Sequence, residues 1–517
     1  MKLMREFNIA GVCIPDMHYM VEISDKIKTI KKLVDGGKYF TINRARQYGK
    51  TTTMFMLQKE LTNEYAVIST SFEGIGGDIF KEEREFSSQV LKTFSDDTRF
   101  VDKELAEEIK RVNQNITSLG DLSNAITELC LNSKKKIVLM IDKVDKSSDN
   151  QIFLHFIGML RNKYLDRNMK KDYTFYSVIL AGVHDVKNLK LKLRPDEERK
   201  YNSPWNIAVD FNVDMSFNPK EISTMLVEYE KDHNTGMNIG GISEEIYSYT
   251  SGYPFLASKI CKLMDENLDK KFTSEGLQEA VKTILNEKNT LFDDLIKNLE
   301  NNKELYDSVY NQLILGQEYT FNIDNSTTSI GSMFGIFRQQ NGKRVIHNKI
   351  FEQRIYAYLS SNLEEKENMD GYNFRDNFIT EKGELNVERI LERFQLMMKE
   401  EYSDRDKTFL ERQGRLLFIA FLRPVINGVG FALKEVQISQ EQRLDILVTY
   451  GKKKYVIELK KWYGEEYHKK GLEQLERYIT SQGVEEGYLI IFNLNKDKKY
   501  TNDVREVNGK RIYEVVV

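Results

Sequence analysis

The sequence has little cysteine, no long apolar run and almost no excess of one charge, and each shortage excludes a class of protein. Three cysteines scattered over 517 residues form neither a disulfide framework nor a paired metal-ligand spacing, so we expect a protein of the reducing cytoplasm. No stretch approaches the roughly 18 to 20 apolar residues of a transmembrane helix, and we expect no membrane association. The net charge of −3 excludes a chain that is cationic throughout, but it is compatible with local basic surfaces.

What the chain does contain is typical of a globular protein of several domains. Hydrophobic residues make up 40% of it and charged residues 30%, and its length corresponds to about three domains of usual size. Over residues 1–215, helical stretches alternate with the apolar runs KYFTIN, YAVISTSF, KKIVLMID and YSVILAG. This alternation predicts an α/β domain with a mostly parallel sheet.

A linker and two further regions are predicted after residue 215. Residues 216–362 carry apolar residues at helical spacing, and Asn341-Gly342 between two short strands predicts a type I′ hairpin. Helices followed by such a hairpin resemble a winged-helix unit, and a small helical packing domain fits equally well. Residues 363–386 are charged and predict a linker, whereas 387–517 predict a second α/β domain.

The stretch TINRARQYGKTTTMFML ends like a phosphate-binding loop. Such a loop follows a strand, surrounds phosphate with backbone N–H groups, and leads into a helix whose first lysine and Ser/Thr bind phosphate and Mg²⁺. We therefore assign nucleotide binding to Gly49, Lys50, Thr51 and Thr52. Arg44 stands where the usual pattern G-x-x-x-x-G-K-[ST] begins with glycine. An ordinary helix N-terminus with a solvated lysine is the alternative.

An acidic strand end supports the nucleotide-binding interpretation. In IVLMIDKVD a buried strand places Asp142 beside the phosphate loop, where it would hold Mg²⁺ together with Thr51. Hydrolytic enzymes commonly have a glutamate at the next position to orient water, and this chain has Lys143, which cannot accept a proton. Slow or absent hydrolysis is one hypothesis. Ordinary hydrolysis, with Asp145 or another acid positioning the water, is the other.

The stretch RLDILVTYGKKKYVIELKKW predicts a hairpin that gathers ionisable side chains. If residues 451–454 form its loop, Asp445 lies opposite Lys460, and strand alternation places Asp445, Glu458 and Lys460 on one face. Two carboxylates can share Mg²⁺ or Mn²⁺, and a lysine beside them can activate a water that attacks a phosphodiester. This arrangement is the core of PD-(D/E)XK nucleases, and a surface salt-bridge ladder is the alternative. The other face is predicted to be apolar, with Leu444, Ile446, Val448, Ile457 and Leu459.

Several segments taken together resemble the AAA-like ATPases of bacteria that carry a C-terminal PD-(D/E)XK nuclease domain. They are GKYFTINRARQYGKTT, IVLMID, SVILAGVHDVKNLK, SPWNIAVDFNVDMSF and SGYPFL, and the resemblance covers nearly the whole chain. It implies a P-loop ATPase domain followed by a helical, winged-helix-like region and a restriction-endonuclease-like domain. It also implies that Arg44 is ordinary for the family, whereas Lys143 is a departure. Residues 252–254 resemble the G-x-P motif of signal-transduction ATPases, with a plain helix-terminating turn as the alternative.

Residues around the hairpin add to the predicted nuclease site. Gln474 and Tyr478 lie four residues apart on one helical face, as the supporting residues of such nucleases do, and this implies a catalytic role for Gln474. Glu411, on the helix before the first strand, is a candidate further metal ligand. A cluster of lysines surrounds the predicted hairpin. These side chains could bind the phosphate backbone of nucleic acid, or they could simply be solvated. They are Lys452, Lys453, Lys454, Lys461, Lys469 and Lys470.

These observations predict an ATP-binding, ATP-regulated nuclease that uses Mg²⁺ or Mn²⁺ and cleaves nucleic acid, with DNA as the expected substrate. The combination of domains suggests defence against foreign nucleic acid. The main alternative is a nucleotide-sensing signalling or DNA-binding ATPase whose nuclease-like domain does not cut, and a third is an ATPase motor with a structural C-terminal domain. The sequence leaves open whether the chain forms a homo-oligomer.

Overall fold

The computed structural model describes most of the chain and divides it into two compact units. The described residues are 5–74, 76–144, 150–183, 205–313, 317–366, 378–380, 382–401, 411–426, 430–437, 443–451, 453–493, 495 and 498–517. The N-terminal unit comprises Met1–Gly236, Gly252–Lys270 and Ser329–Ile336, and the C-terminal unit comprises Met237–Ser251, Lys271–Thr328 and Phe337–Val517.

The N-terminal unit is built on a four-stranded parallel sheet. Its strands are β1 (Tyr39–Asn43), β2 (Ala66–Ser71), β3 (Ile137–Asp142) and β4 (Ser177–Gly182), in the order β1-β4-β3-β2. The two central strands, β4 and β3, are buried along their whole length, as expected of a parallel sheet covered on both faces. The predicted α/β domain with a parallel sheet is confirmed.

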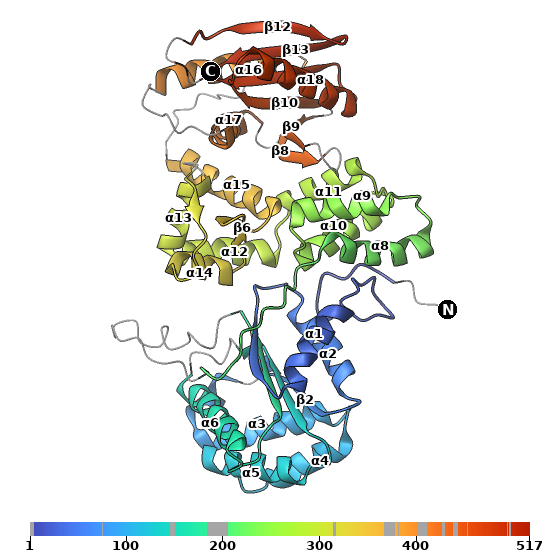
Figure 1. Ribbon diagram of the computed structural model, residues 1–517, viewed down its shortest axis with the longest axis vertical. Coiled ribbons are helices and arrows are strands. Elements are labelled where there is room, and N and C mark those ends of the chain that lie inside the picture. The colour runs from blue at the N-terminus through green and yellow to red at the C-terminus, as the bar shows by residue number, and fades with distance from the viewer. Residues whose placement is uncertain are drawn as a thin grey trace. The chain divides into compact units, whose positions relative to one another are not determined.

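Helices connect these strands and cover the sheet. They are α1 (Ser24–Asp35), α2 (Lys50–Leu61), α3 (Glu83–Thr98), α4 (Lys103–Val112), α5 (Leu119–Asn132) and α6 (Gln151–Asn168). Figure 1 shows α1 and α2 on one side of the sheet and α6 on the other. Aromatic rings fill much of the core, where Phe72, Phe86 and Phe156 are fully buried. Because the strands are parallel, the residues that follow them meet at one edge, the carboxyl edge.

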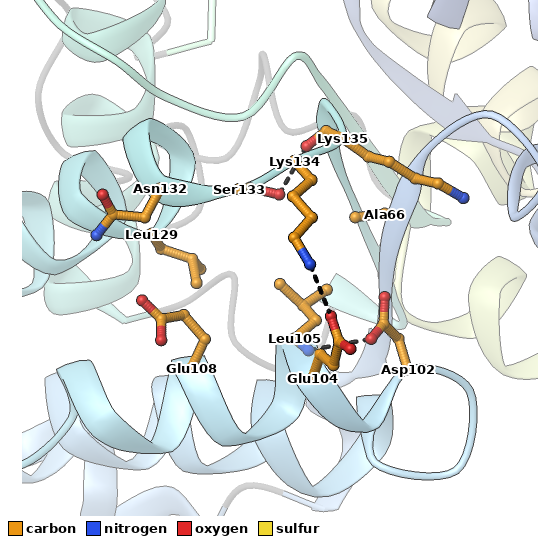
Figure 2. Close-up of a pocket in the computed structure, with 10 residues that line it drawn as sticks. All are labelled: Ala66, Asp102, Glu104, Leu105, Glu108, Leu129, Asn132, Ser133, Lys134 and Lys135. Atoms are coloured by element: carbon orange, nitrogen blue, oxygen red, sulfur yellow. Dashed lines mark hydrogen bonds and ion pairs between the residues drawn. The ribbon is translucent and has the colours of Figure 1, made fainter.

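The opposite, amino edge of the same sheet carries a pocket of about 280 Å³ (Figure 2). It lies where β2 begins, at Ala66, and α4 and the end of α5 supply most of the lining. Glu104 and Lys134 form an ion pair across it at 3.5 Å, and both side chains are exposed. None of the residues predicted to bind nucleotide lines this pocket.

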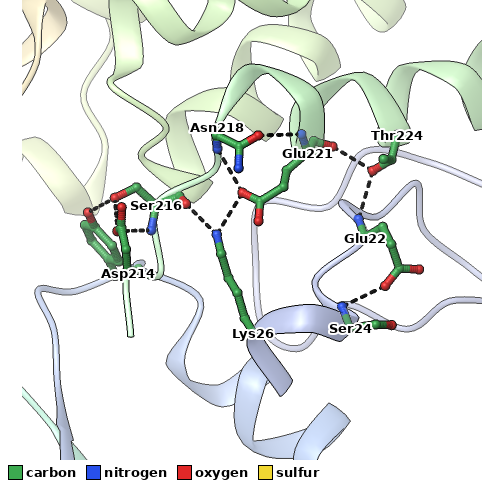
Figure 3. Close-up of polar contacts among 9 residues, drawn as sticks. Glu22, Ser24, Lys26, Asp214, Ser216, Asn218, Glu221 and Thr224 are labelled. Carbon is green, nitrogen blue, oxygen red and sulfur yellow. Dashed lines mark hydrogen bonds and ion pairs between the residues drawn. The ribbon is translucent and has the colours of Figure 1, made fainter. Parts of the chain in front are cut away.

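A polar network joins α1 to the start of α8 (Pro219–His233) within the N-terminal unit (Figure 3). The Asn218 side chain accepts from the N–H of Glu221, and the Glu221 carboxylate accepts from the N–H of Asn218, which makes a reciprocal capping box. Lys26 of α1 donates to the same carboxylate at 2.8 Å and to the Ser216 carbonyl at 2.6 Å. Because both charged side chains are mostly buried, this contact fixes the start of α8 against α1.

The helix α10 (Pro254–Glu266) of the N-terminal unit follows a turn that requires glycine. Gly252 has a φ of 73°, and its carbonyl accepts from the Phe217 N–H at 2.8 Å. A Cβ atom at Gly252 would lie 2.0 Å from the Phe217 carbonyl oxygen. Proline suits the first position of α10, because its φ is helical and its missing N–H would have had no partner there.

The helical part of the C-terminal unit includes a small antiparallel sheet. The helices are α9 (Ile239–Thr250), α11 (Ser274–Asn286), α12 (Thr290–Glu300), α13 (Lys303–Leu313) and α15 (Lys349–Lys366). Of α14 (Ser326–Met333), the residues up to Thr328 belong to this unit and those from Ser329 onward belong to the N-terminal unit. The strands are β5 (Tyr319–Thr320), β6 (Phe337–Gln340) and β7 (Lys343–Ile346), in the order β5-β7-β6. Asn341 and Gly342, with φ of 49° and 78°, connect β6 to β7, so the predicted two-residue hairpin is confirmed.

The rest of the C-terminal unit consists of a six-stranded mixed sheet and three helices. The strand order of the sheet is β12-β13-β11-β10-β9-β8. Its strands are β8 (Gly430–Gln437), β9 (Arg443–Tyr450), β10 (Lys453–Lys461), β11 (Glu486–Phe492), β12 (Asn502–Val507) and β13 (Lys510–Val516), and its helices are α16 (Val387–Glu401), α17 (Glu411–Ile426) and α18 (Glu465–Ser481). On β11, Gly487 packs against Ile479 of α18, whereas Phe492 packs against Gly414 of α17. Because Gly487 and Phe492 are an odd number of residues apart, α18 and α17 cover opposite faces.

The long helices of the chain carry charged side chains along their length. Both α6 and α15 contain 18 residues, and each mixes lysine, arginine and acidic residues with apolar ones. Among the helices of the described residues, none combines the length and the apolar character needed to cross a lipid bilayer.

We expect Gly252→Ala to destabilise the N-terminal unit strongly. The new Cβ would clash with the Phe217 carbonyl, and a positive φ by itself costs a residue with a side chain roughly 1 kcal/mol. Gly236→Ala is the matched control, because Gly236 has a φ of 74° and open space around its Cβ position. Urea unfolding should show a loss of about 3 kcal/mol or more at Gly252 and about 1 kcal/mol at Gly236. Equal losses would contradict the clash.

Glu245 of α9 should make the stability of the C-terminal unit depend on pH. Burial raises its pKa from 4.5 to about 7, although the Ser274 hydroxyl donates to it at 2.9 Å. Since the folded state binds this proton more tightly, the free energy of unfolding falls as the pH rises from 4.5 to about 7, by about 3 kcal/mol in all. Glu245→Gln should therefore stabilise the chain in urea at pH 8 and not at pH 4.5. Glu279→Gln on exposed α11 surface is the control, and a pH-independent gain at Glu245 would contradict this account.

Candidate functional site

The residues that follow β1 form a loop around the predicted phosphate-binding lysine. Gly49 has a φ of 77° and immediately precedes α2, of which Lys50 is the first residue. The Lys50 ammonium turns back on the loop and donates to the carbonyls of Arg44 and Ala45, each at 2.8 Å. The lysine therefore lies beside the N-terminus of α2, where free N–H groups and the helix dipole favour an anion.

Arg44 has a structural role in this loop. Its guanidinium donates to the carbonyls of Asn43 and Val213 at 2.8 and 2.7 Å and lies 5.3 Å from the centre of the Phe211 ring. Burial lowers the pKa of this arginine. The side chain thus ties the first position of the loop to the segment that contains Phe211 and Val213, an attachment that a glycine at this position would lack.

Thr51 and Asp142 meet at the carboxyl edge of the sheet. The Thr51 hydroxyl donates to the buried Asp142 carboxylate at 2.7 Å. Hydroxyl and carboxylate oxygens are ligands that Mg²⁺ accepts, so the pair fits the ion predicted there. Thr52, the fourth residue of the predicted set, accepts a hydrogen bond from the Cys13 N–H at 3.2 Å, and its hydroxyl therefore faces the segment before α1.

Lys143 is engaged in contacts at the same edge. Its backbone is left-handed, with φ of 56°, its N–H donates to Asp142 at 2.8 Å, and its ammonium forms an ion pair with Glu73. Glu73 follows the end of β2 by two residues and was not among the residues predicted from the sequence. The sequence shows only that Glu73 follows an apolar strand. Its closeness to Lys143 can be inferred only when β2 is known to lie beside β3. Asp145, the acid considered for water positioning, lies outside the described residues.

The turn at residues 252–254 lies against the phosphate loop. The Tyr253 hydroxyl donates to the Arg46 carbonyl, and the Tyr253 ring lies 4.7 Å from that of Tyr48. Pro254 would be 3.9 Å from a Cβ atom at Gly49. Of the two interpretations of this turn, contact with the loop is the one that the geometry supports.

The C-terminal hairpin has a tighter loop than the predicted one. Lys453 pairs with Tyr450, so the loop consists of residues 451–452 and not of 451–454. Gly451, with φ of 58°, permits the tight turn because it has no side chain. The predicted register was therefore wrong by two residues.

The shift in register changes which residues lie opposite the acidic side chains, but it does not change the face of the hairpin on which these side chains lie. In the observed register Ile446 pairs with Ile457, so the next pair places Asp445 opposite Glu458. The predicted register placed Asp445 opposite Lys460. Because both loops contain an even number of residues, Asp445, Glu458 and Lys460 share one face in either register.

Buried polar contacts hold these side chains together. Asp445 accepts from the N–H of Leu459 at 3.0 Å, and Glu458 accepts from the N–H of Asp445 at 3.4 Å. The Lys460 ammonium lies 2.8 Å from the Glu458 carboxylate, which is only 1% exposed. Arg415 of α17, which was not predicted, lies 3.1 Å from the Asp445 carboxylate.

The two carboxylates of this cluster are unfavourable next to each other unless positive charge is close. Burial, followed by the charge of Asp445, raises the pKa of Glu458 well above its ordinary value, and Lys460 opposes the rise. A divalent cation between the carboxylates would remove the cost of keeping both ionised. The described residues contain no group of three or more His, Cys, Asp or Glu placed to hold a metal. Two carboxylates alone would therefore need water molecules to complete the coordination of Mg²⁺ or Mn²⁺. Glu411 is the first residue of α17, and its side chain lies outside the description.

The helix α18 covers the same face of the hairpin. The Gln474 amide donates to the Tyr478 hydroxyl, and a Cβ atom at Gly471 would lie 3.4 Å from Lys460. Of the predicted basic cluster, Lys453 is paired with Glu384, Lys470 is paired with Glu466, and Lys452 lies outside the described residues.

Comparison with known proteins identifies the family. The family model described as an AAA-like domain matches residues 14–357, which is more than half of the chain. The chain therefore belongs to the AAA-like domain family and is an ATP-binding protein of the P-loop ATPase type. No curated protein matches it.

Three solved structures show distant similarity at 10% identity, and each match covers 68% of this chain. A Walker-type ATPase of Pyrococcus abyssi has a TM-score of 0.47 with 99% of its own chain covered. The ORC2 protein of Aeropyrum pernix, in ADPNP-ADP complexes, has 0.32 with 98% covered, and the ORC1 protein of the same organism, in complex with DNA, has 0.30 with 95% covered.

We expect Lys50→Ala to weaken ATP binding about 10- to 100-fold. A charge-assisted contact to phosphate contributes about 1.5 to 3 kcal/mol, and 1.4 kcal/mol is a tenfold change in affinity. Lys59→Ala, in the last turn of the same helix and exposed, is the control. Calorimetry measures the affinities, and thermal unfolding checks the fold. A folded Lys50→Ala variant with unchanged affinity would contradict the phosphate-loop assignment.

Proposed function

We propose that the chain is an ATP-regulated, metal-dependent nuclease that cleaves phosphodiester bonds of nucleic acid, with DNA as the expected substrate. The observation that carries the proposal is the convergence of Asp445, Glu458 and Lys460 on one face of a buried hairpin. A nucleotide-binding region in the same chain supports the regulatory part, because ATP shifts a conformational equilibrium when it binds one conformation more tightly than the other.

The parts of the chain would have separate roles. Residues 1–215 bind nucleotide and act as the switch, and residues 216–362 transmit its state or contact DNA. Residues 363–386 form a linker, and residues 387–517 cut the substrate. Defence against foreign nucleic acid is the biological role that this combination suggests.

The hairpin residues would act as follows. Asp445 and Glu458 would hold Mg²⁺ or Mn²⁺ with their carboxylate oxygens, and Glu411 would add a ligand. When bound, such an ion polarises a phosphoryl oxygen and lowers the pKa of water. Lys460 would hydrogen-bond the attacking water or the phosphate oxygen that gains charge, and Gln474 would keep the surroundings of Lys460 in place through Tyr478.

A second function is favoured by the ion pair between Arg415 and Asp445. The guanidinium neutralises a carboxylate that a metal ion would otherwise neutralise, in a place where both side chains are mostly buried. In a nucleotide-sensing signalling or DNA-binding ATPase with a non-catalytic nuclease-like domain, this arginine would stabilise the fold without metal.

We expect Lys460→Ala to reduce metal-dependent cleavage about 100-fold or more and to keep most of the metal affinity, because the lysine serves the water and the developing charge. Asp445→Asn should lose both, since it keeps an acceptor for the Leu459 N–H and removes the charge that holds the ion. The measurements are Mg²⁺ and Mn²⁺ affinity by calorimetry and cleavage of duplex DNA, single-stranded DNA and RNA, with and without ATP.

Lys399→Ala is the control for these variants, because Lys399 is an exposed lysine on α16. Undiminished cleavage by Lys460→Ala would place the active site elsewhere. If the unmodified chain binds ATP and neither binds metal nor cleaves any of the three substrates, the second function is the correct one.

A further inference from the structure

Glu73 and Lys143 form an ion pair at the carboxyl edge of the N-terminal sheet. Each follows the end of a strand, and the register pairs Ser71 of β2 with Asp142 of β3, so the two side chains leave neighbouring strands at the same level. Their exposed fractions are 43% and 45%. The pair is therefore open to a ligand that binds at this edge.

Direct hydrogen bonds link the pair to the predicted Mg²⁺ site. One carboxylate oxygen of Asp142 accepts from the Lys143 N–H at 2.8 Å, and the other accepts from the Thr51 hydroxyl at 2.7 Å. Lys143 adopts a φ of 56°, which costs a lysine of order 1 kcal/mol or more. The hydrogen bond to Asp142 and the ion pair with Glu73 hold the lysine in this conformation.

We propose that Glu73 is the carboxylate that orients the attacking water in ATP hydrolysis, and that Lys143 restrains it until ATP is bound. The inference rests on the proposed nucleotide site. Hydrolysis by an enzyme of this type needs a hydrogen-bond acceptor beside the γ-phosphate. Lys143 occupies the usual position and cannot accept, whereas Glu73 approaches the same edge from the adjacent strand.

The chemistry of the step is ordinary hydrolysis. The water oxygen bonds to the γ-phosphorus while the bond from that phosphorus to the β–γ bridging oxygen breaks, and ADP leaves with the electron pair. Glu73 accepts a hydrogen bond from the water, whose proton passes to solvent as phosphate is released. The phosphates of ATP carry more charge than one carboxylate, so they compete for the Lys143 ammonium and free Glu73.

The test compares the full chain with Glu73→Gln, Lys143→Met and the double variant. Calorimetry measures the affinity for ATP with Mg²⁺, and single-turnover phosphate release measures hydrolysis at saturating ATP. We expect Glu73→Gln to lower release about 100-fold or more and to leave the affinity within about threefold. Lys143→Met should raise release, and the double variant should lose that gain.

The exposed ion pair between Glu104 and Lys134 at the amino edge provides matched controls (Figure 2). Glu104→Gln and Lys134→Met should change neither measurement. Equal effects of Glu73→Gln and Lys143→Met, in the same direction, would indicate a structural ion pair and overturn the proposal. Tight ATP binding with no Glu73-dependent hydrolysis in either background would also overturn it. Failure of the unmodified chain to bind ATP would instead refute the nucleotide site itself.

Discussion

The direction of the strands in the N-terminal sheet is the constraint on which the nucleotide site depends. Four parallel strands end at one edge, so residues that are far apart in the sequence come together there. The hydrogen bond between Thr51 and Asp142 joins the phosphate loop to β3, and the ion pair between Lys143 and Glu73 joins β3 to β2. An antiparallel strand at any of these positions would carry its terminal residues to the other edge.

The C-terminal site depends on a different constraint, the burial of two carboxylates next to each other. Glu458 is almost completely buried beside the Asp445 carboxylate, so ionising both groups is unfavourable unless cations are close. Lys460 and Arg415 are those cations in this structure. A metal ion would take over part of their role, and the competition between Arg415 and the ion is the feature that separates the two candidate functions.

Much of this arrangement could be predicted because it follows from local patterns. The alternation of apolar strands and helices led to the parallel sheet, and Asn341-Gly342 led to a hairpin with the expected positive φ angles. The face of Asp445, Glu458 and Lys460 was predictable since it depends only on whether the loop has an even number of residues. The exact pairing was not, because loops of two and four residues both satisfy that condition and the tighter one forms at Gly451.

Local sequence patterns indicate where strands and helices form, which residues alternate onto one face, and where a glycine ends the phosphate loop just before a helix. Which strand ends are neighbours depends on the order of the strands in the folded sheet. Glu73 lies 70 positions from Lys143 in the sequence, and Arg415 belongs to a helix that no pattern connects with Asp445. Local propensity and periodicity act over a few residues, whereas such contacts arise from the order of strands in a sheet and the packing of helices on it.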